Sequence, residues 1–336
     1  MYYDQYRGKK RGRSDERGRR SGGCLGFIIK KLLKLIAILL AIAILCAGVL
    51  YVVPIGFWNV QPRDNDLAIN GDLPSDRLNV LLLGLDELDE DHQRSDTIII
   101  VSVGKSDVRL ASVQRDTMVD IPGYGRGKIN SAYARGGAEM SMRCVNETFG
   151  MNITKYIVVD YITLVKLIDA AGGIDIEITD AELAQMNENV GDSAHIFKPL
   201  GYDAQPMTQS GKVHLNGLFA LGYSRIRSID TDYMRTFRQR TVIAHLLESV
   251  RKNIANPIMY AKVIDVCLHY MDTNLSIPAL VALGERMLTN KSIQQSRTPD
   301  KTCCVDDGSA IKISDAAQNK AILRSFLYDP ISKNVE

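Results

Sequence analysis

The sequence lacks the signatures of several common enzyme classes. Its five histidines are scattered and none forms a His-x-x-x-His pair, so the sequence does not indicate a zinc hydrolase. It contains no Gly-x-Ser-x-Gly, no Gly-x-Gly-x-x-Gly after an expected strand and no Cys-x-x-Cys. These absences argue against a serine esterase, a dinucleotide-binding domain, a thioredoxin-like site and a zinc ribbon. The glycine-rich run 121–130 contains Lys128 but has neither the spacing nor the Ser/Thr of a P-loop.

Charge of both signs is missing from one long stretch near the N-terminus. Residues 35–53 are nineteen residues without a charge, which as a helix would span roughly 28 Å, close to the hydrocarbon thickness of a bilayer. Residues 1–34 hold eleven Lys and Arg against three acids, a local +8 that leaves −6 for the rest of the chain. This Gly- and Ser-rich segment cannot bury a core, so we expect a disordered tail attracted to anionic lipid.

The sequence therefore predicts a single-pass protein of the cell membrane with its N-terminus in the cytoplasm. The transmembrane helix is expected at 35–53, a linker at 54–77, and an extracytoplasmic domain after it. The alternative, a buried core helix of a soluble protein, fits the basic flank and the aromatic edge at Phe57-Trp58 less well.

Cysteine is scarce, with six residues, of which Cys24 and Cys46 lie in or beside the predicted span. Beyond the membrane disulfides are permitted, and four cysteines allow three pairings, among which the sequence does not choose. The four are Cys144, Cys267, Cys303 and Cys304.

The outer region begins with three short apolar runs, 79–85, 97–103 and 108–113, each typical of a buried strand and each followed or preceded by charged residues. Helices are expected at 131–149 and 162–171 and strands at 155–160 and 174–178. Residues 187–211 have no clear period and are predicted to form a loop over a site. After residue 253 the pattern is helical.

Two carboxylates stand at the ends of neighbouring strands. Asp86 follows the first apolar run and Asp96 precedes the second. Antiparallel pairing of these strands would bring the two side chains together, and close carboxylates with hard oxygen ligands favour Mg²⁺ or Mn²⁺ between them. The alternative is that they cap turns or pair with Arg94 and Arg115.

Five arginines fall within residues 225–240. Arg225 and Arg227 are spaced so that an extended segment would point both to one side. Arg235, Arg238 and Gln239 follow at the spacing of one helical face. Planar guanidinium groups aimed at one spot suit phosphate oxygens, although a solvated basic helix end is the alternative. Phosphoryl transfer needs little beyond such charges, and outside the membrane its donor would have to be carried by a lipid.

Eight motifs occur in a fixed order behind the apolar run. They are Asn79–Asp86, Arg94–Thr97, Arg115–Thr117, Lys128–Tyr133 followed by Gly136-Gly137, Asp169–Ile174, Leu215–Gly217, Tyr223–Arg227, and Asp232-x-x-Arg235 with Arg238-Gln239. In this combination the sequence resembles the LytR-CpsA-Psr family of cell-envelope proteins over residues 78–252. Residues 253–336 lie outside the resemblance and are expected to form a helical extension packed on the same domain.

The resemblance implies an α/β/α sandwich with a central mixed sheet flanked by helices and a long apolar pocket for a polyprenyl chain. It implies transfer of a glycopolymer from undecaprenyl-pyrophosphate to a peptidoglycan hydroxyl, with Asp86 and Asp96 as ligands of Mg²⁺ (or Mn²⁺). The catalytic residues it implies are Arg94, Arg115, Arg225 and Arg227, which clamp phosphate oxygens, and Asp232, which orients or deprotonates the acceptor. The substrate-binding residues are Lys128, Arg235, Arg238 and Gln239. Asp116 is expected to hold an arginine in place.

The sequence departs from many relatives at Gln114, where they have proline, and at Arg240, where they have a second glutamine. Three other functions stay open. One is a module that binds lipid-linked glycan without catalysis, and another is a pyrophosphatase that uses water as acceptor. The third is a transcriptional regulator, as family members have often been described, but the predicted topology places the arginines across the membrane from DNA and no nucleic-acid partner is expected. The identity of the polymer and the oligomeric state are not indicated.

Overall fold

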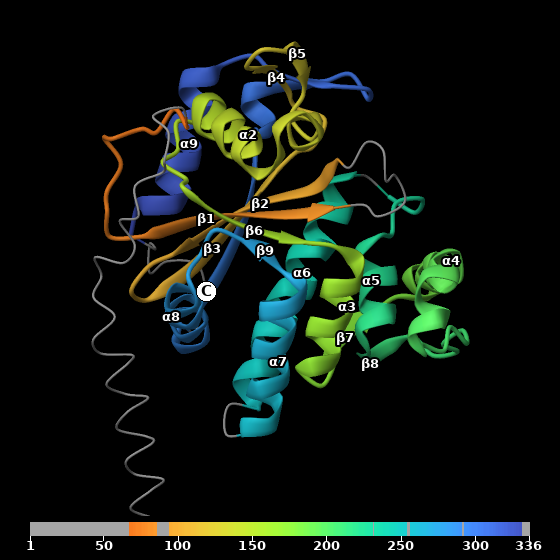
Figure 1. Cartoon of the computed structure of the whole chain (residues 1–336). Coiled ribbons are helices and arrows are strands. Elements are labelled where there is room, and N and C mark those ends of the chain that lie inside the picture. The colour runs from red at the N-terminus through yellow and green to blue at the C-terminus, as the bar shows by residue number, and fades with distance from the viewer. Residues whose placement is uncertain (1–66, 86–93, 231, 254–255, 291, 331–336) are drawn as a thin grey trace, which may run out of the picture. The chain divides into compact units, whose positions relative to one another are not determined.

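The computed structural model describes residues 67–85, 94–230, 232–253, 256–290 and 292–330 (Figure 1). They belong to one compact unit that runs from Trp58 to Glu336. Within these ranges no helix is both long and apolar enough to cross a membrane. The tail predicted at 1–34, the transmembrane helix predicted at 35–53, Asp86 and the side chain of Asp232 lie outside the described part.

A six-stranded mixed sheet lies at the centre, in the order β10-β3-β2-β1-β6-β9. The pairs β1–β2, β2–β3 and β6–β9 are antiparallel, whereas β1–β6 and β3–β10 are parallel. In chain order the strands of this sheet are β1 (Leu78–Leu85), β2 (Ser95–Val103), β3 (Asp107–Val113), β6 (Lys155–Val159), β9 (Asp272–Thr273) and β10 (Ser292–Thr298). The three strands predicted from the first apolar runs are confirmed.

Alternating side chains of the central strands fill two different cores. Leu81 and Leu83 of β1 pack with α2 and α9, whereas Val80 packs with α8 on the opposite face. The helices are α2 (Ser131–Phe149), α3 (Tyr161–Ala170), α4 (Asp180–Phe197), α5 (Gly217–Ser224), α6 (Asp232–Lys252), α7 (Pro257–Tyr270), α8 (Ile277–Thr289) and α9 (Ala316–Tyr328). Figure 1 shows α2 and α9 on one side of the sheet and α6, α7 and α8 on the other, so a mixed sheet flanked by helices is confirmed.

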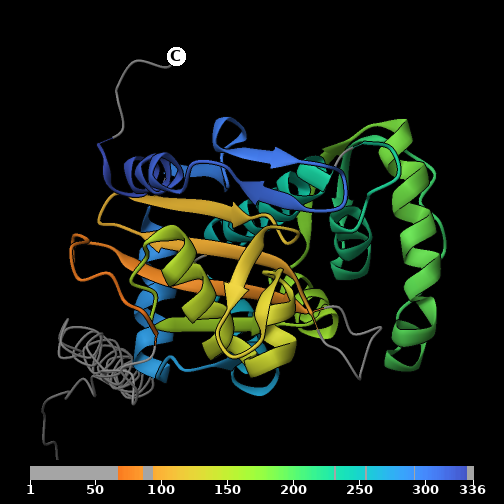
Figure 2. The same cartoon turned by 90° about the horizontal axis from the view of Figure 1, so that it is seen from above.

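A side lobe holds a third core. It consists of the hairpin β7 (Ile174–Ile178) and β8 (Gly211–Leu215), with α3, α4 and α5 around it. Figure 2 shows α4 at the outer side of this lobe. Helices α3 and α5 meet so closely that a Cβ on Gly217 would lie 2.1 Å from the carbonyl oxygen of Val165. The position therefore requires glycine because of the approach of a neighbouring backbone.

The prediction of a loop at 187–211 is wrong for its first half. Helix α4 runs to Phe197 and is followed by the short 3-10 helix η2 (Lys198–Leu200). Its start is fixed by a capping box between Thr179 and Glu182. Only Met186, Val190 and Phe197 among its large apolar residues are buried, so the apolar stripe is too sparse to reveal the helix by periodicity alone.

The C-terminal third contributes strands as well as helices. Helices α7, α8 and α9 confirm the helical pattern predicted after residue 253, but β9 and β10 are strands of the central sheet. The run Ser292–Thr298 contains a single large apolar residue, Ile293, and therefore carries no alternating pattern. The shorter elements are the hairpins β4 (Met118–Ile121) with β5 (Gly125–Lys128) and β11 (Cys304–Asp306) with β12 (Ile311–Ile313), and the 3-10 helix η3 (Lys301–Cys303).

Part of the predicted linker packs on the domain. Leu67 and Leu73 are buried in the core formed by α2 and α9. Arg77 donates to Asp107 at 2.6 Å, and Asp107 also accepts from Arg109. These contacts attach the segment 67–77 to the sheet, so it is not a free connection. The four cysteines beyond the predicted span, Cys144, Cys267, Cys303 and Cys304, are unpaired thiols.

Candidate active site

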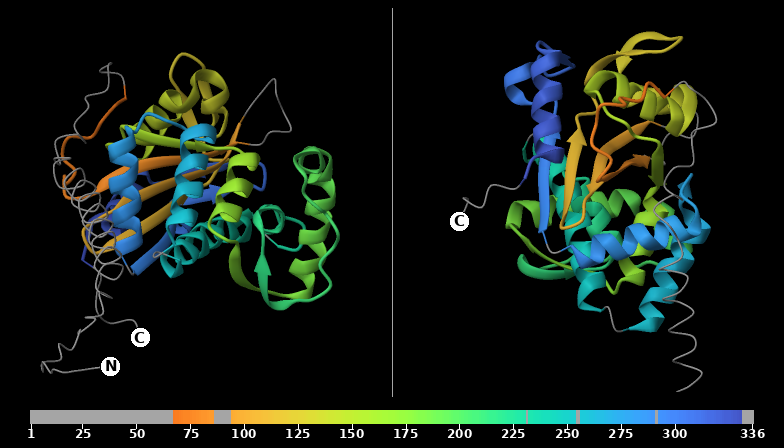
Figure 3. Two further views of the ribbon diagram at one scale, coloured as in Figure 1. Left: turned by 60° about the horizontal axis from the view of Figure 1, so that its bottom comes forward. Right: turned by 90° about the vertical axis from the view of Figure 1, so that its left-hand side faces the viewer.

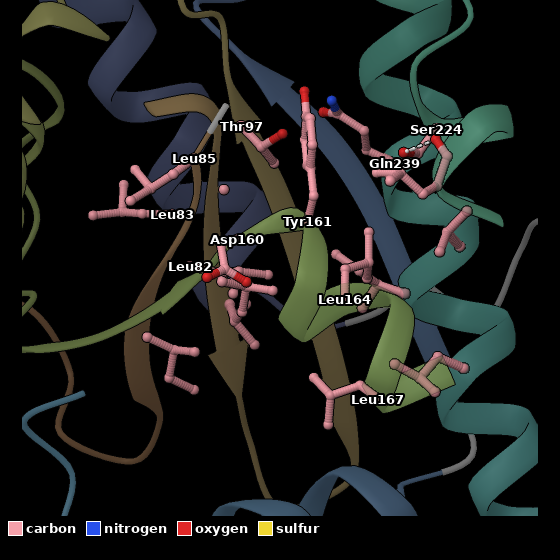
Figure 4. Close-up of a pocket in the computed structure, with 18 of the residues that line it drawn as sticks. Leu82, Leu83, Leu85, Thr97, Asp160, Tyr161, Leu164, Leu167, Ser224 and Gln239 are labelled. Carbon is pink, nitrogen blue, oxygen red and sulfur yellow. Dashed lines mark hydrogen bonds between the residues drawn. The ribbon is translucent and has the colours of Figure 1, made fainter. Parts of the chain in front are cut away.

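A pocket of about 300 Å³ lies against the face of the sheet that α6, α7 and α8 cover. Its floor comes from β1, β2 and β6, and its walls from α3, α6, α7 and α8. Most of the lining is aliphatic. Figure 4 shows Leu164 and Leu167 of α3 along the wall, Leu82 of β1 on the floor, and the polar groups of Thr97, Tyr161 and Gln239 toward one end.

The polar end lies where β1 ends and β2 begins. Asp96, Arg225, Arg227, Arg235 and Gln239 all line the pocket there. Leu85 pairs with Ser95 across the antiparallel strands. Because Asp86 follows Leu85 directly, the antiparallel pairing on which the prediction of neighbouring carboxylates depended is present.

Asp96 is the centre of this end. Its Oδ2 accepts a hydrogen bond from Arg115 and another from Arg227 Nη2 at 2.9 Å, and its Oδ1 accepts from Asn130 Nδ2 at 3.3 Å. Burial alone would raise the pKa of this carboxyl, but the positive charges of Arg115, Arg235 and Arg227 outweigh it, so the pKa of Asp96 is lowered below 3.8. Asp96 is therefore ionised at neutral pH.

The arginines approach from three elements. Arg115 follows β3 and also lies 3.4 Å from Asp116, whose other oxygen accepts from Lys128 at 2.7 Å. This agrees with the predicted orienting role of Asp116. Arg235 of α6 is 1% exposed, and its charge acts on Asp96. Arg235 is buried and Arg227 is 51% exposed, so the polar end is a strongly charged site that reaches solvent at Arg227.

Arg225 and Arg227 do not share an extended strand as the sequence suggested. Arg225 ends α5 with helical backbone angles, and the fully buried Ile226 separates it from Arg227. The guanidinium of Arg225 donates to Ser193 Oγ at 2.6 Å and lies 5.1 Å from the ring centre of Tyr161. Both arginines nevertheless line the pocket.

Other predicted site residues lie elsewhere. Arg238 does not line the pocket, because it points to the side lobe, where it donates to Glu182 at 2.9 Å and to Asp230 at 3.1 Å. Lys128 is bound to Asp116, and Arg94 is exposed at the start of β2. Arg238 therefore links α6 to α4 and to Asp230, and Lys128 contacts Asp116 and does not line the pocket.

Arg240, the departure noted in the sequence, is also structural. It is 2% exposed and donates to Ser112 Oγ at 2.6 Å and to Gln295 Oε1 at 3.1 Å. Burial lowers the pKa of Arg240 to about 10. It therefore ties α6 to β3 and β10 and does not face an incoming polymer.

Two residues of the site were not singled out from the sequence. Asn130 lies in the Lys128–Tyr133 motif without an assigned role, and its amide donates to Asp96. Tyr161 begins α3, two residues after the end of β6, and lies beside Arg225. The end of a strand is where ligand-binding side chains gather in α/β sheets, so the position of Tyr161 after an apolar run was the signal available.

Asp96 is the described residue that the sequence analysis assigned to Mg²⁺. Asp96 supplies an ionised carboxylate, which is the ligand type that a hard cation prefers. Its oxygens are shared with two guanidinium groups and an amide. In the part of the chain that the structure describes, no three His, Cys, Asp or Glu side chains converge on one point. Asp96 is thus one candidate ligand within the described residues, and its predicted partner Asp86 lies outside them.

The chain matches the model of the LytR_cpsA_psr family over residues 59–325. The match extends past residue 252, so most of the C-terminal third belongs to the shared region. The chain is similar to the regulatory protein MsrR of Staphylococcus aureus (strain COL), with 30% identity over 271 residues that cover 77% of both chains. It is 35% identical, over 224 residues, to the polyisoprenyl-teichoic acid–peptidoglycan teichoic acid transferase TagU of Enterococcus faecalis (strain ATCC 700802 / V583), which covers 63% of this chain and 67% of TagU.

Solved structures share the fold. TagT bound to LI-WTA superposes with a TM-score of 0.59 at 21% identity and covers 75% of this chain and 90% of that chain. The protein YwtF (TagT) with bound octaprenyl pyrophosphate lipid superposes with a TM-score of 0.56 at 20% identity and covers 80% of this chain and 95% of that chain. On the extent of the family match and the similarity to MsrR, this chain belongs to the LytR_cpsA_psr family.

Proposed function

We propose that the protein is a membrane-anchored phosphotransferase that moves a glycopolymer from undecaprenyl-pyrophosphate to a sugar hydroxyl of peptidoglycan through a phosphodiester. One observation carries the proposal. Asp96, Arg225, Arg227 and Arg235 form a charged end to an otherwise aliphatic pocket. A pyrophosphate attached to a prenyl chain has the same division, with a dianionic or trianionic head and an apolar tail.

The names of the relatives support the class of substrate. TagU is named a teichoic acid transferase that acts between a polyisoprenyl-linked donor and peptidoglycan, and YwtF (TagT) has been solved with a polyprenyl pyrophosphate. The apolar lining of the present pocket, from Leu82 on the floor to Leu164 on the wall, suits an isoprenoid in the same way.

In the proposed reaction the acceptor hydroxyl attacks the phosphorus that carries the glycan. The bond from that phosphorus to the bridging oxygen breaks, the polyprenyl phosphate leaves with the electron pair, and the glycan is joined through a phosphodiester. Arg227 and Arg225 stabilise the negative charge that develops on the phosphate oxygens. Asp232, with which α6 begins, takes the proton of the hydroxyl in this proposal.

The remaining polar residues hold these groups in place. Asp96 binds Arg115 and Arg227, so the two guanidinium groups are oriented before a substrate enters. The Tyr161 ring and Ser193 fix Arg225. Gln239 lines the pocket one helical turn after Arg235 and offers an amide for hydrogen bonds to the pyrophosphate. A bound Mg²⁺, held by Asp96 with Asp86, would neutralise pyrophosphate charge.

The test uses the full chain in detergent with Mg²⁺, a short polyprenyl-pyrophosphate-linked glycan and peptidoglycan fragments. Mass spectrometry should detect glycan joined to peptidoglycan by a phosphodiester. Tight lipid binding without a joined product would instead support the binding module, and release of free glycan phosphate would support the pyrophosphatase.

Asp96→Asn is expected to weaken the affinity for the Mg²⁺ that supports transfer. The amide keeps the shape of the side chain but removes the negative charge that attracts a divalent cation and Arg115. The rate is measured over a titration of Mg²⁺, and the midpoint should move to higher concentration. An unchanged midpoint would remove Asp96 from the set of ligands. Asp175→Asn, an exposed carboxylate of the side lobe, is the control.

Leu164→Trp is expected to weaken binding of octaprenyl pyrophosphate. Leu164 lines the pocket, and the larger indole would occupy part of its 300 Å³. Overfilling of a packed apolar site costs about 1–3 kcal/mol, so the Kd should rise about tenfold or more. Isothermal titration calorimetry measures the Kd, and Leu164→Met, which conserves volume, is the control. Equal affinity of the Trp and Met variants would place the lipid outside this pocket.

A further inference from the structure

Two helices next to the pocket carry an unusual share of exposed apolar side chains. Helix α7 has 14 residues and α8 has 13, yet together they hold six of the thirteen large apolar residues that are exposed in the described part of the chain. Each of the six is at least 40% exposed. They are Ile258, Ile264, Leu268, Tyr270, Ile277 and Val281, and we call them the α7–α8 apolar surface.

Four of these side chains are arranged by the helical repeat. Ile264 and Leu268 are four residues apart on α7, as are Ile277 and Val281 on α8, so each pair forms a stripe along its helix. Lys262, Asp265 and His269 lie on the flank of α7 that also carries Ile258, and Asp265 and His269 form an exposed pair at 3.1 Å. The apolar stripe of Ile264 and Leu268 thus lies beside a charged flank, which is the pattern of a helix that rests on an interface.

The α7–α8 apolar surface continues into the pocket. Cys267, three residues after Ile264, lines the pocket, and so does Met287 of α8. Both helices also pack against the small core of Ala171, Val250 and Met259, α7 with Tyr260 and Val263 and α8 with Leu288. Figure 3 shows α7 and α8 next to each other in front of the sheet, on the side away from α2 and α9. The same two helices thus line the pocket, with Cys267 of α7 and with Leu283 and Met287 of α8, and present aliphatic groups outward to the surroundings.

Under the proposed function, the pocket is too small to enclose the whole lipid. A volume of about 300 Å³ is at the lower end of pockets that hold a drug-sized ligand, so it encloses only part of an undecaprenyl chain. Each methylene left in water costs about 0.8 kcal/mol. The remaining isoprene units therefore need another apolar environment directly beside the apolar end of the pocket.

We infer that the α7–α8 apolar surface rests on the outer leaflet of the membrane, so that the tail of the lipid passes from the pocket into the bilayer. The occupant is a lipid surface and not a second protein, because the lipid-linked donor is held in a membrane and the chain has nineteen uncharged residues at 35–53. Tyr270 lies under Lys166 Nζ at 4.8 Å from the ring centre, and such a pair of an aromatic ring and a lysine suits the boundary between headgroups and hydrocarbon.

This inference rests on the proposed function, which supplies the lipid-linked donor. Its first test needs no substrate. The chain has one tryptophan, Trp58, so Trp58→Phe leaves no indole. In that background Ile264→Trp places a single fluorophore on the α7–α8 apolar surface. Leu200→Trp places one at an equally exposed position, 45% against 44% for Ile264, at the end of η2 in the side lobe.

Both full-length variants are reconstituted in phosphatidylcholine–phosphatidylglycerol vesicles with brominated acyl chains. We expect the tryptophan at 264 to emit at shorter wavelength and to lose most of its emission to bromine, whereas the tryptophan at 200 keeps its emission. Equal emission from the two positions, or quenching at 200 alone, would overturn the inference.

A second measurement separates this inference from the proposed function. The triple variant Ile264→Ser, Leu268→Ser, Ile277→Ser should transfer glycan from a short, water-soluble donor at the wild-type rate but lose transfer from an undecaprenyl donor embedded in vesicles. Leu200→Ser with Val305→Ser, two exposed apolar residues elsewhere, is the control. Loss with both donors, or with neither, would contradict a docking role. If the wild type transfers nothing from either donor, the proposed function fails, and the fluorescence result still decides where the membrane lies.

Discussion

Replacing Arg227 by alanine is expected to lower the rate of glycan transfer by roughly a hundredfold to a thousandfold, the usual effect of removing one group that stabilises developing charge. Arg227 lines the polar end of the pocket and binds Asp96 at 2.9 Å. Its side chain is 51% exposed, so the substitution removes a charge and no core packing. The melting temperature should therefore stay close to that of the wild type.

The measurement compares initial rates and melting curves of three proteins. Arg227→Lys keeps the positive charge but loses the planar guanidinium that binds two phosphate oxygens at once, so its rate should fall between those of the wild type and Arg227→Ala. Arg126→Ala, an exposed arginine of the β4–β5 hairpin, controls for loss of charge elsewhere. A wild-type rate in Arg227→Ala would contradict the assignment of the site.

Replacing Asp107 by asparagine is expected to destabilise the fold by about 3–5 kcal/mol, because removal of one partner from a buried ion pair leaves an uncompensated charge. Asp107 is 3% exposed and binds both Arg77, at 2.6 Å, and Arg109. Arg77 also donates to Ser102, and Arg109 to the carbonyl of Phe326 in α9. The cluster thus joins the segment before β1, two strands and the last helix.

Urea unfolding of the wild type, Asp107→Asn and Asp175→Asn measures the effect. Asp175 forms an exposed pair with His214 at 2.8 Å, so its loss should change the free energy of unfolding by less than about 1 kcal/mol. A similarly small change for Asp107→Asn would show that the buried cluster does not stabilise the fold.

The effect of Asp107 should also depend on pH. Burial opposes ionisation of this carboxyl, but the hydrogen bonds and charges of Arg109 and Arg77 outweigh it and lower its pKa below 3.8. A carboxyl with a lowered pKa stabilises the fold above its ordinary value of 3.8, and this contribution is lost as the pH falls through the lowered pKa. The difference in stability between the wild type and Asp107→Asn should therefore be constant at neutral pH and shrink below pH 3.8.

Much of the central architecture was determined by the sequence alone. The apolar runs at 79–85, 97–103 and 108–113 are strands because both faces of the sheet are covered by helices, and a strand buried on both faces is apolar throughout. The starts of α7 and α9 follow from local chemistry, since Asn256 and Asp315 accept hydrogen bonds from the first turns of these helices. Such features depend on neighbours in the chain and can be read there.

The elements that the sequence did not reveal depend on distant partners. Strand β10 is polar along most of its length and is a strand because β3 offers it an edge in register from Asp107 to Val113. Helix α4 has few buried apolar residues and is stabilised by its capping box and by packing in the side lobe. Neither interaction leaves a periodic pattern in the segment itself.

The same division holds for the site. The sequence supplied the residue types, a carboxylate and several arginines near strand and helix ends, but not which of them meet. Asp96 binds Arg115, 19 residues away, and Arg227, 131 residues away. On α6 the spacing alone grouped Arg235 with Arg238, yet Arg235 faces the pocket and Arg238 faces Glu182 of α4. Which face of a helix binds a ligand is decided by what packs against the others, and only the tertiary structure fixes that packing.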